Sequence, residues 1–440
     1  MGAMGKAVRS TLGGIALAVA FALAVPFLVP GSYFIPEVTR IASERRAQPV
    51  EMEDLTLHLL PTPRVIGHRI SVGRKGEILI GELEIVPDLH SLIVGPRSLR
   101  LVRASRVAFD ESAFAIQRAI PKRSDEPVPV RRLILNTVKF NHPRVDVPIF
   151  NVDVKLGERR RVREARFETS DGALSLVVRP RGDDTAALQL SATNWTLPFG
   201  APLTFDALAA HGTLKGRQLE VAKVEGALYG GRLVGAAHAD WEKELQLAGS
   251  AHLAGVDLAP VQKALGKPGK LSGRLKADAE FSTNAKTPAE LRDALTLDGP
   301  FEVLGGVYQG VDLSRAGELA GERRLDDATH FEELRGTLEL RGERVRLNQL
   351  CIRSPKIVAG GNVDIAPDKA LSGKLHIAVA QTGGFVGVPV ALSGTTDEPS
   401  MRPSKGYLLS AAIGTALLPG IGTSIGLTLG GQIERSSGCK

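Results

Sequence analysis

Apolar and polar residues alternate with a period of two along most of the chain. This pattern is typical of β-strands with one buried face. Segments with a helical period are scarce, and short helices are expected only at Glu111–Ile120, Leu258–Leu265 and Thr287–Ala294. The pattern therefore predicts a mainly β protein with a few short helices. The clearest strand segments are Leu174–Val178, Leu188–Leu190, Leu245–Leu247, Leu338–Leu340, Val345–Leu347 and Leu375–Val379.

Two stretches of the chain resemble each other at a period of about 124 residues. Gly212-Thr-Leu opens the first stretch and Gly336-Thr-Leu opens the second, and each is followed by two further strand-like segments. Repeated strand and turn units favour a sheet that grows by the addition of similar strands. The alternative is that unrelated β-meanders with Gly turns look alike in composition.

The N-terminal residues carry a membrane signal. Lys6 and Arg9 precede the uncharged apolar run Leu12–Pro30. In a helix, about 19 residues extend over about 28 Å, which is close to the thickness of a bilayer core. We interpret this run as a single-pass signal anchor with its basic end in the cytoplasm. A cleaved signal peptide with Ala22–Ala24 as its cleavage site is the alternative.

Composition narrows the possible functions. The chain has 440 residues, of which 43% are hydrophobic, and a formal net charge of +7. Its two cysteines exclude a Cys-rich metal centre, although one bridge between Cys351 and Cys439 can still form. Aromatic residues make up only 5% of the chain, which disfavours nucleic-acid binding by base stacking. The basic excess favours anionic surfaces such as phospholipid headgroups.

No catalytic or metal-binding motif stands out. The nine histidines are scattered, without a metal-ligand spacing, and no nucleophile elbow occurs. Gly266–Ser272 and Gly420–Gly426 fail the phosphate-loop and dinucleotide patterns and are interpreted as loops. We therefore expect no enzyme, no metal and no cofactor. Cys351 is expected to be a small buried hydrophobic residue, and Cys439 lies in a polar tail.

Two segments are interpreted as boundaries between parts of the chain. Pro121–Val130 is rich in Pro and charge, and Glu158–Arg166 is a run dominated by arginine. The arginine run is interpreted as a solvated turn or strand edge. A patch that faces lipid headgroups is the alternative.

Three stretches resemble the AsmA family of Gram-negative envelope proteins. Thr287–Leu313 resembles the family's element of an amphipathic helix, a short loop, a strand and Gly-x-Asp-Leu. Gly336–Ser393 contains Gly-Thr-Leu, Ser-Pro-Lys-Ile, Gly-Gly and Val-Pro-Val in the family's order. Leu83–Gly95 looks like a membrane-proximal strand, Pro-Asp, short helix and Gly segment. The order and spacing of these degenerate motifs carry the resemblance.

The resemblance implies an elongated, strongly curved antiparallel sheet that forms a groove, preceded by one N-terminal transmembrane helix. The family is similar to bridge-like lipid-transfer proteins, whose apolar concave face holds acyl chains. Four segments are expected: 1–35, a cytoplasmic stub and transmembrane anchor; 36–157, a membrane-proximal chorein-like β segment; 158–405, an AsmA-like β-rich groove body; and 406–440, an apolar Gly-rich tail.

An apolar groove can bind lipid tails without a polar site, because each buried methylene contributes about 0.8 kcal/mol. A closed core built from the same residues is the alternative, and a register shift of one residue would reverse the assigned face. The alternating apolar residues give the candidate groove positions: Leu219, Val221, Leu245, Leu247, Leu338, Leu340, Val345, Leu347, Leu375, Ile377 and Val379.

The C-terminal tail is uncharged from Gly406 to Ile433. We interpret it as a segment that touches a membrane or docks on a partner, and the spacing of its glycines resembles that of closely packed membrane helices. The alternatives are a segment that packs back on the groove and a second membrane span. The candidate residues are Tyr407, Leu408, Leu409, Leu417, Leu418, Gly422, Gly426 and Gly430.

Together these observations predict a protein of the cell inner membrane with its body in the periplasm. Its expected role is to bind and shuttle phospholipid, in support of outer-membrane biogenesis and lipid homeostasis. The alternative is a structural or regulatory envelope protein that binds outer-membrane assembly factors through its surface. An envelope hydrolase is a third class, for which no residue is a candidate.

Overall fold

The computed structural model of the chain describes residues 35–46, 48–94, 97–113, 128–141, 147–157, 161–182, 184–197, 202–267, 269–286, 290, 293–310, 312–313, 328–381, 384–403 and 439. These residues form 21 strands and three helices, which confirms the mainly β fold. Two compact units divide the chain, unit 1 at Met1–Gly182 and unit 2 at Asp183–Lys440. The expected boundary between residues 157 and 158 falls inside unit 1 and stays a prediction.

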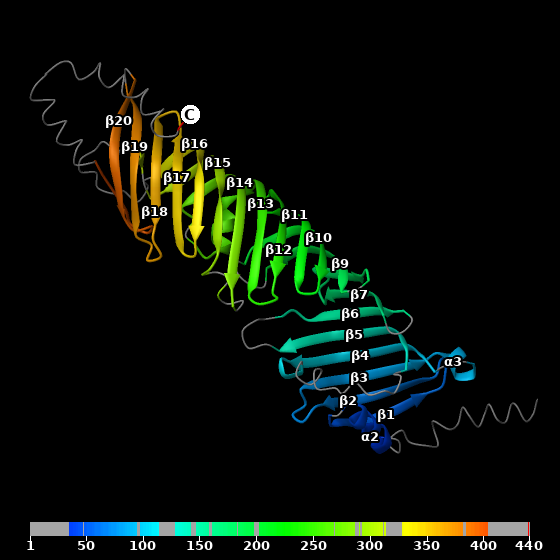
Figure 1. The fold of residues 1–440 in the computed structure, drawn as a ribbon. Coiled ribbons are helices and arrows are strands. Elements are labelled where there is room, and N and C mark those ends of the chain that lie inside the picture. Colours follow the sequence, from blue (N-terminus) through cyan, green and yellow to red (C-terminus); the bar gives the residue numbers. More distant parts are fainter. Residues whose placement is uncertain are drawn as a thin grey trace, which may run out of the picture. The chain divides into compact units, whose positions relative to one another are not determined.

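Unit 1 is a ladder of eight strands (Figure 1). Its neighbouring strands pair in sequence order, and all pairs are antiparallel except β4 and β5. The parallel pair corrects the expectation of a purely antiparallel sheet. The unit contains α2 (Ile35–Arg46), β1 (Val50–His58), β2 (Arg64–Val72), β3 (Ile78–Pro87), α3 (Leu89–Ile93), β4 (Leu99–Asp110), β5 (Val130–Asn141), β6 (Phe150–Leu156), β7 (Val162–Thr169) and β8 (Leu174–Pro180).

The start of unit 1 follows the expected order of strand, Pro-Asp and short helix. β3 ends at Pro87, and the carboxylate of Asp88 accepts a hydrogen bond from the backbone N–H of His90 at the start of α3. Such a cap satisfies one of the N–H groups that a helix start leaves without a partner. In the core of the unit, Ala104 and Val107 of β4 pack with Val138 of β5.

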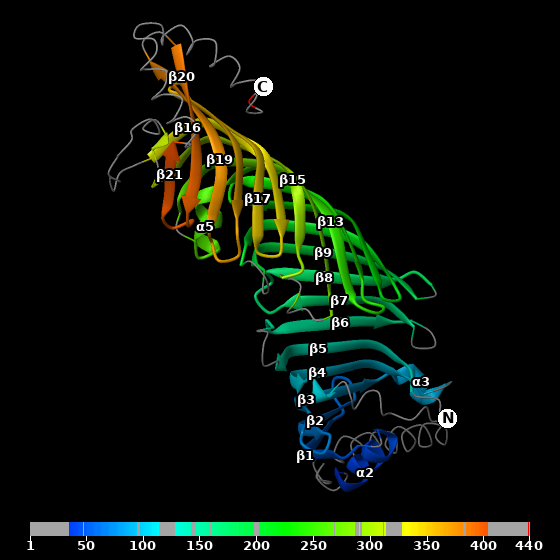
Figure 2. The ribbon, with the colours of Figure 1, turned by 60° about the vertical axis from the view of Figure 1, so that its left-hand side comes forward.

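Unit 2 is an antiparallel ladder of thirteen strands in sequence order (Figure 1). The strands bend along their length, and α5 lies at the end of the unit that carries β21 (Figure 2). The elements are β9 (Thr185–Thr196), β10 (Thr204–Lys215), β11 (Gln218–Leu228), β12 (Gly231–Asp240), β13 (Leu245–Asp257), α5 (Leu258–Ala264), β14 (Leu271–Ala285), β15 (Thr296–Gln309), β16 (Ala328–Arg341), β17 (Arg344–Arg353), β18 (Ile357–Ile365), β19 (Leu371–Gln381), β20 (Gly384–Gly394) and β21 (Pro399–Pro403).

The internal repeat corresponds to two sets of three strands, β10–β12 and β16–β18. In the first set the register shifts at Gly212 and between Val221 and Val224. In the second set it shifts between Arg335 and Thr337, and between Leu347 and Leu350. Both sets therefore carry irregularities at equivalent places. Bulges bend a strand and increase its twist, so their repetition helps to curve the sheet.

Of the three short helices expected from the sequence, one lies wholly within the described residues. The helix at Leu258–Leu265 is confirmed as α5. Most of Glu111–Ile120 and part of Thr287–Ala294 lie outside the described residues. In the part of the chain that the structure describes, no helix has the length and apolar character needed to cross a bilayer. The predicted span Leu12–Pro30 also lies outside that part.

Candidate apolar binding cavity

A cavity of about 480 Å³ lies on one face of the unit 2 sheet. Its size falls within the range of about 300–1,000 Å³ that is typical of small-molecule sites. Leu258 of α5 borders it beside residues from β13 to β21. Among the described lining residues only Asp278 is of a charged type, and its carboxylate contacts His252 on the opposite face of the sheet. Most of the lining is aliphatic: Leu253, Leu271, Leu275, Leu297, Leu334, Leu338, Leu347, Leu350, Leu371, Leu375 and Leu392.

Strand register explains why these side chains meet. Leu338 of β16 lies opposite Leu347 of β17, which lies opposite Val363 of β18. All three residues line the cavity. Because side chains directly opposite each other project from the same face, the register carries one apolar row across three strands.

Two further predicted positions extend this row toward the strand ends. Leu340 lies opposite Leu297, and Val345 lies opposite Ile365. Leu297 and Ile365 line the cavity, whereas Leu340 and Val345 do not. Both predicted residues are half-buried. They belong to the cavity face and lie beside the cavity.

Four predicted positions lie on the β11–β13 part of the same face. Leu219 and Leu247 both lie opposite Ala239 of β12. Leu245 and Leu247 share their face of β13 with the cavity residue Leu253, because side chains two residues apart project from the same face. Val221 lies one step along β11 from Leu219. All four predicted residues, Leu219, Val221, Leu245 and Leu247, are half-buried, and none lines the cavity.

The last three predicted positions lie on β19. Leu375 lines the cavity and is 7% exposed. Ile377 is 0% exposed and packs in a cluster with Leu375 and Val390. Val379 pairs through its backbone with Ile357 and Val386, and its side chain lies outside the described residues. The cavity face therefore closes into a packed core toward this end of β19.

The opposite face of the sheet is polar. Lys276 pairs with Glu302 at 3.1 Å, Arg341 with Asp298 at 2.7 Å, and Arg346 with Asp364 at 2.9 Å. The hydrogen bond to Asp298 raises the pKa of Arg341. His252 also contacts Asp278, and His238 lies 2.9 Å from Glu220. These side chains alternate with the apolar ones along each strand, so the two faces of unit 2 differ sharply in polarity.

A lysine joins distant strands beside the cavity. Lys270, just before β14, donates hydrogen bonds from its Nζ to the carbonyl oxygens of Thr396 at 3.0 Å and Asp397 at 3.2 Å. Thr396 also lines the cavity. The contact joins residues 126 and 127 positions apart in the chain, so the sheet curls back on itself at this place.

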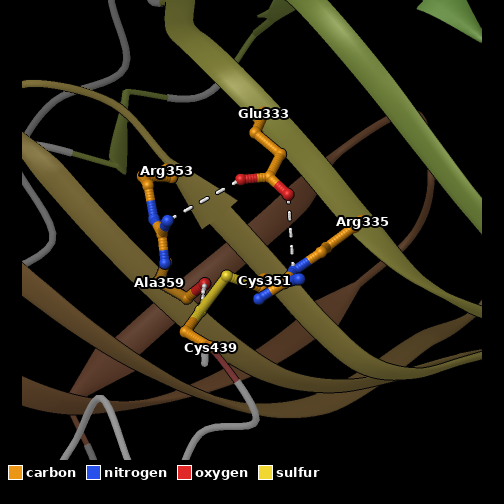
Figure 3. Close-up of a disulfide and its surroundings, with 6 residues drawn as sticks. All are labelled: Glu333, Arg335, Cys351, Arg353, Ala359 and Cys439. Atoms are coloured by element: carbon orange, nitrogen blue, oxygen red, sulfur yellow. Dashed lines mark hydrogen bonds and ion pairs between the residues drawn. A yellow bond between two sulfur atoms is a disulfide. The ribbon is translucent and has the colours of Figure 1, made fainter.

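The two cysteines form a disulfide on the polar face (Figure 3). Cys351 lies opposite Arg335 and Gly360, and the Sγ of Cys439 lies 3.5 Å from the carbonyl oxygen of Ala359. Both cysteines are fully buried. Beside them Glu333 lies between two arginines, 3.5 Å from Arg335 and 3.9 Å from Arg353. The sequence left open whether Cys351 is a free buried residue or is bridged to Cys439. In the structure it is bridged, and the disulfide holds Cys439 against the sheet.

Every predicted tail residue lies outside the described residues. They are Tyr407, Leu408, Leu409, Leu417, Leu418, Gly422, Gly426 and Gly430.

Sequence reasoning missed several lining residues that follow register shifts. The ladder shifts at Gly273, between Arg335 and Thr337, and between Leu347 and Leu350. The shift after Leu347 reverses the alternation along β17, so a strict period of two omits Leu350 and Ile352. The glycines next to these shifts are the available signal, since glycine within a strand often marks a bulge. The aromatic lining residues Phe301, Tyr308 and Phe331 were also not among the predicted groove positions.

The described residues contain no candidate metal site. Among the residues that the structure describes, no group of three or more His, Cys, Asp or Glu side chains gathers closely enough to hold an ion.

Residues 164–350 match the family model described as the AsmA family. This confirms the resemblance for the part of the chain that runs from β7 to β17. No curated protein and no solved structure matches the chain.

Proposed function

We propose that the chain is a non-enzymatic envelope protein that binds and shuttles phospholipid through the apolar cavity of unit 2. The match of residues 164–350 to the AsmA family supports this proposal. The observation that carries the proposal is one continuous apolar face that lines a cavity. An antiparallel sheet with one apolar face has to cover that face with a second layer or with a ligand. Among the described helices of unit 2, only α5 lies against this face.

Acyl chains fit this cavity by their chemistry. The described lining offers mainly aliphatic and aromatic carbon, so it suits a chain of methylenes better than a polar metabolite. Burial of about ten methylenes contributes about 8 kcal/mol before the cost of ordering the chain. This free energy is enough for retention and needs no catalytic residue.

The proposed location is the inner membrane, with the body in the periplasm and support of outer-membrane biogenesis as the role. Two features support it. The apolar run Leu12–Pro30 follows Lys6 and Arg9 as in an anchor with a cytoplasmic start. The Cys351–Cys439 disulfide suits an oxidising compartment such as the bacterial periplasm, because cytosolic thiols are kept reduced.

The test uses adjacent residues that project from opposite faces of β16. A photo-reactive benzoylphenylalanine replaces Leu338 on the cavity face or Glu339 on the polar face of the full chain in a Gram-negative host. After illumination, mass spectrometry identifies the adducts. We expect phospholipid adducts at position 338 and not at 339, since a strand projects successive side chains to opposite sides.

Three outcomes would count against lipid binding. Adducts only to other segments of this chain would mean that the apolar face is closed by protein. Equal capture at both positions would reflect general membrane proximity. Capture of envelope proteins at position 339, without lipid at 338, would favour the structural and regulatory role.

A further inference from the structure

A group of basic and apolar side chains gathers at one end of the strands of unit 1. We call it the basic rim. Its basic members are Arg97, Arg100, Arg131, Arg132, Lys155, Arg161, Arg163, Arg179 and Arg181, and all of them are exposed. Its exposed apolar members are Leu57, Leu60, Leu89, Val94 and Val162.

The first half of the rim is assembled by the β1–β2 hairpin and α3. His58 lies opposite Arg64, so residues 59–63 form the turn at this end. β3 ends at the same side, because Val65 pairs with Ile85, and α3 follows it. The turn presents Leu60, 65% exposed, and the end of α3 presents Val94, 62% exposed.

The second half is assembled by the ends of β4–β8. Pro87 lies opposite Leu99, and because β4 and β5 are parallel, Leu99 lies opposite Val130. Across the next strands, Arg132 lies opposite Lys155. Leu156 pairs with Val162 in β7, and β8 ends at the same side, beside the start of β7. The ladder therefore brings basic residues from five strand ends to one side of unit 1.

Among the described residues at this side, acidic residues are fewer, and their charges are already balanced. Asp88 pairs with Arg131 at 2.6 Å, and Asp153 with Arg132 at 2.7 Å. Glu164 contacts both Lys155 and Arg179. By contrast, the basic residues Arg97, Arg100, Arg161, Arg163 and Arg181 have no ion pair with any residue that the structure describes. The rim therefore carries excess positive charge.

The other ends of the same strands serve as an internal comparison. There the β2–β3 turn carries Arg74 and Lys75 together with Glu77, and Asp110 and Asp171 lie at further strand ends. The charges on that side are mixed. The asymmetry therefore belongs to the rim and is not a general property of unit 1.

We propose that the basic rim docks on the surface of an anionic lipid bilayer. Arginine suits phosphate headgroups because its planar fork donates two parallel hydrogen bonds. The exposed leucines and valines between the arginines would enter the headgroup and acyl boundary, as the apolar side of an interfacial segment does. None of the rim residues is aromatic, which disfavours single-stranded nucleic acid as the ligand.

The experiment uses the full chain reconstituted into vesicles, with an environment-sensitive NBD dye on a single introduced cysteine. Leu60→Cys reports on the rim, and Leu79→Cys, 50% exposed near the other strand ends, is the matched control. The native cysteines are joined in a disulfide, so the dye reacts with the introduced thiol alone under non-reducing conditions. The vesicles contain phosphatidylcholine with or without phosphatidylglycerol, and brominated lipids quench a dye that enters the bilayer.

We expect quenching at position 60 to exceed that at position 79 at least about threefold in phosphatidylglycerol vesicles, and to weaken in salt, because anionic surface attraction is screened. The triple variant Arg161→Glu, Arg163→Glu, Arg181→Glu should lose this difference. The variant Arg74→Glu, Lys75→Glu should keep it. Circular dichroism checks that both variants fold.

Equal quenching at both positions, or no dependence on phosphatidylglycerol, would overturn the proposal. Binding of a short DNA oligonucleotide that depends on the same arginines, with position 60 unquenched, would assign the rim to another polyanion. The proposal does not rest on the cavity, because cavity variants should leave the rim signal unchanged.

Discussion

Unit 1 and unit 2 are built from the same kind of strand ladder, and they use their strands differently. Unit 2 gathers apolar side chains on one face, where they enclose a cavity. Unit 1 gathers charge at its strand ends and packs Ala104, Val107 and Val138 into a closed cluster. The difference teaches that alternation of apolar and polar residues alone does not decide between a core and a binding cavity.

The largest effect on lipid binding is expected from a charge placed inside the cavity. Leu392→Asp puts a carboxylate among apolar lining residues, where it lacks a partner and repels acyl chains. Bound phospholipid, measured by extraction and mass spectrometry, should fall about tenfold or more, which corresponds to about 1.4 kcal/mol or more.

The matched control is the adjacent residue on the polar face. Ala391 is exposed and lies between Lys374 and Arg402, so Ala391→Asp gains basic neighbours. This variant should retain its lipid. If both variants lose lipid equally, the two faces do not differ in function and the comparison fails.

The largest effect on stability is expected where the cavity face closes into a core. Ile377→Ala removes a fully buried side chain from the cluster formed with Leu313, Ile357 and Val390. Such a change costs about 2–5 kcal/mol in free energy of unfolding. Trp195 and Trp241 both lie in unit 2, so tryptophan fluorescence during denaturant unfolding reports on this unit.

Leu347→Ala is the comparison for that variant. Leu347 already borders the cavity and is only half-buried, so its truncation should cost distinctly less than that of Ile377. Equal costs for the two variants would mean that the cavity is packed as tightly as the core.

The smallest effect is expected in the ion pairs of unit 1. The hydrogen bond from Arg132 lowers the pKa of Asp153, and hydrogen bonds from Lys155 and Arg179 lower the pKa of Glu164. A carboxylate with a lowered folded-state pKa stabilises the fold above its unfolded-state pKa, about 4, and this contribution is lost as the pH falls through the folded-state value.

We therefore expect the backbone amides of β5–β8 to keep their protection from hydrogen exchange between pH 7 and pH 5 and to lose part of it below about pH 4. For the Arg132–Asp153 pair, the loss of stabilising free energy is at most about 1 kcal/mol, because the arginine is exposed and its charge is screened by solvent. Hydrogen exchange measured by mass spectrometry resolves these strands. Asp153→Asn should flatten the acid loss there, and an unchanged pH profile would show that the pair contributes nothing.

Several strands were predicted correctly from the sequence. The segments Leu338–Leu340, Val345–Leu347 and Leu375–Val379 lie on β16, β17 and β19 as predicted. The predicted order of strand, Pro-Asp and short helix at Leu83–Gly95 corresponds to β3, Asp88 and α3. The strands depend on local propensity, so their alternating pattern is sufficient to find them, whereas the order at Leu83–Gly95 was expected from the family resemblance.

Lining residues after a bulge could not be found in this way. Leu350 and Ile352 face the cavity because the register shifts after Leu347. The position of a shift depends on pairing with the next strand, which a period of two does not contain. For the same reason the sequence did not separate Ile377, which is sealed in a core, from Leu375, which borders the cavity.

The sequence by itself determined the strand-rich fold, the apolar face of unit 2 and the family of residues 164–350, because these follow from side-chain order along the chain. The tertiary structure alone decided which apolar residues enclose a cavity and which arginines share a rim. Both properties join residues far apart in the chain, as the contacts of Lys270 with Thr396 and Asp397 also do. Strand pairing and sheet curvature bring such residues together, and both arise from contacts between strands.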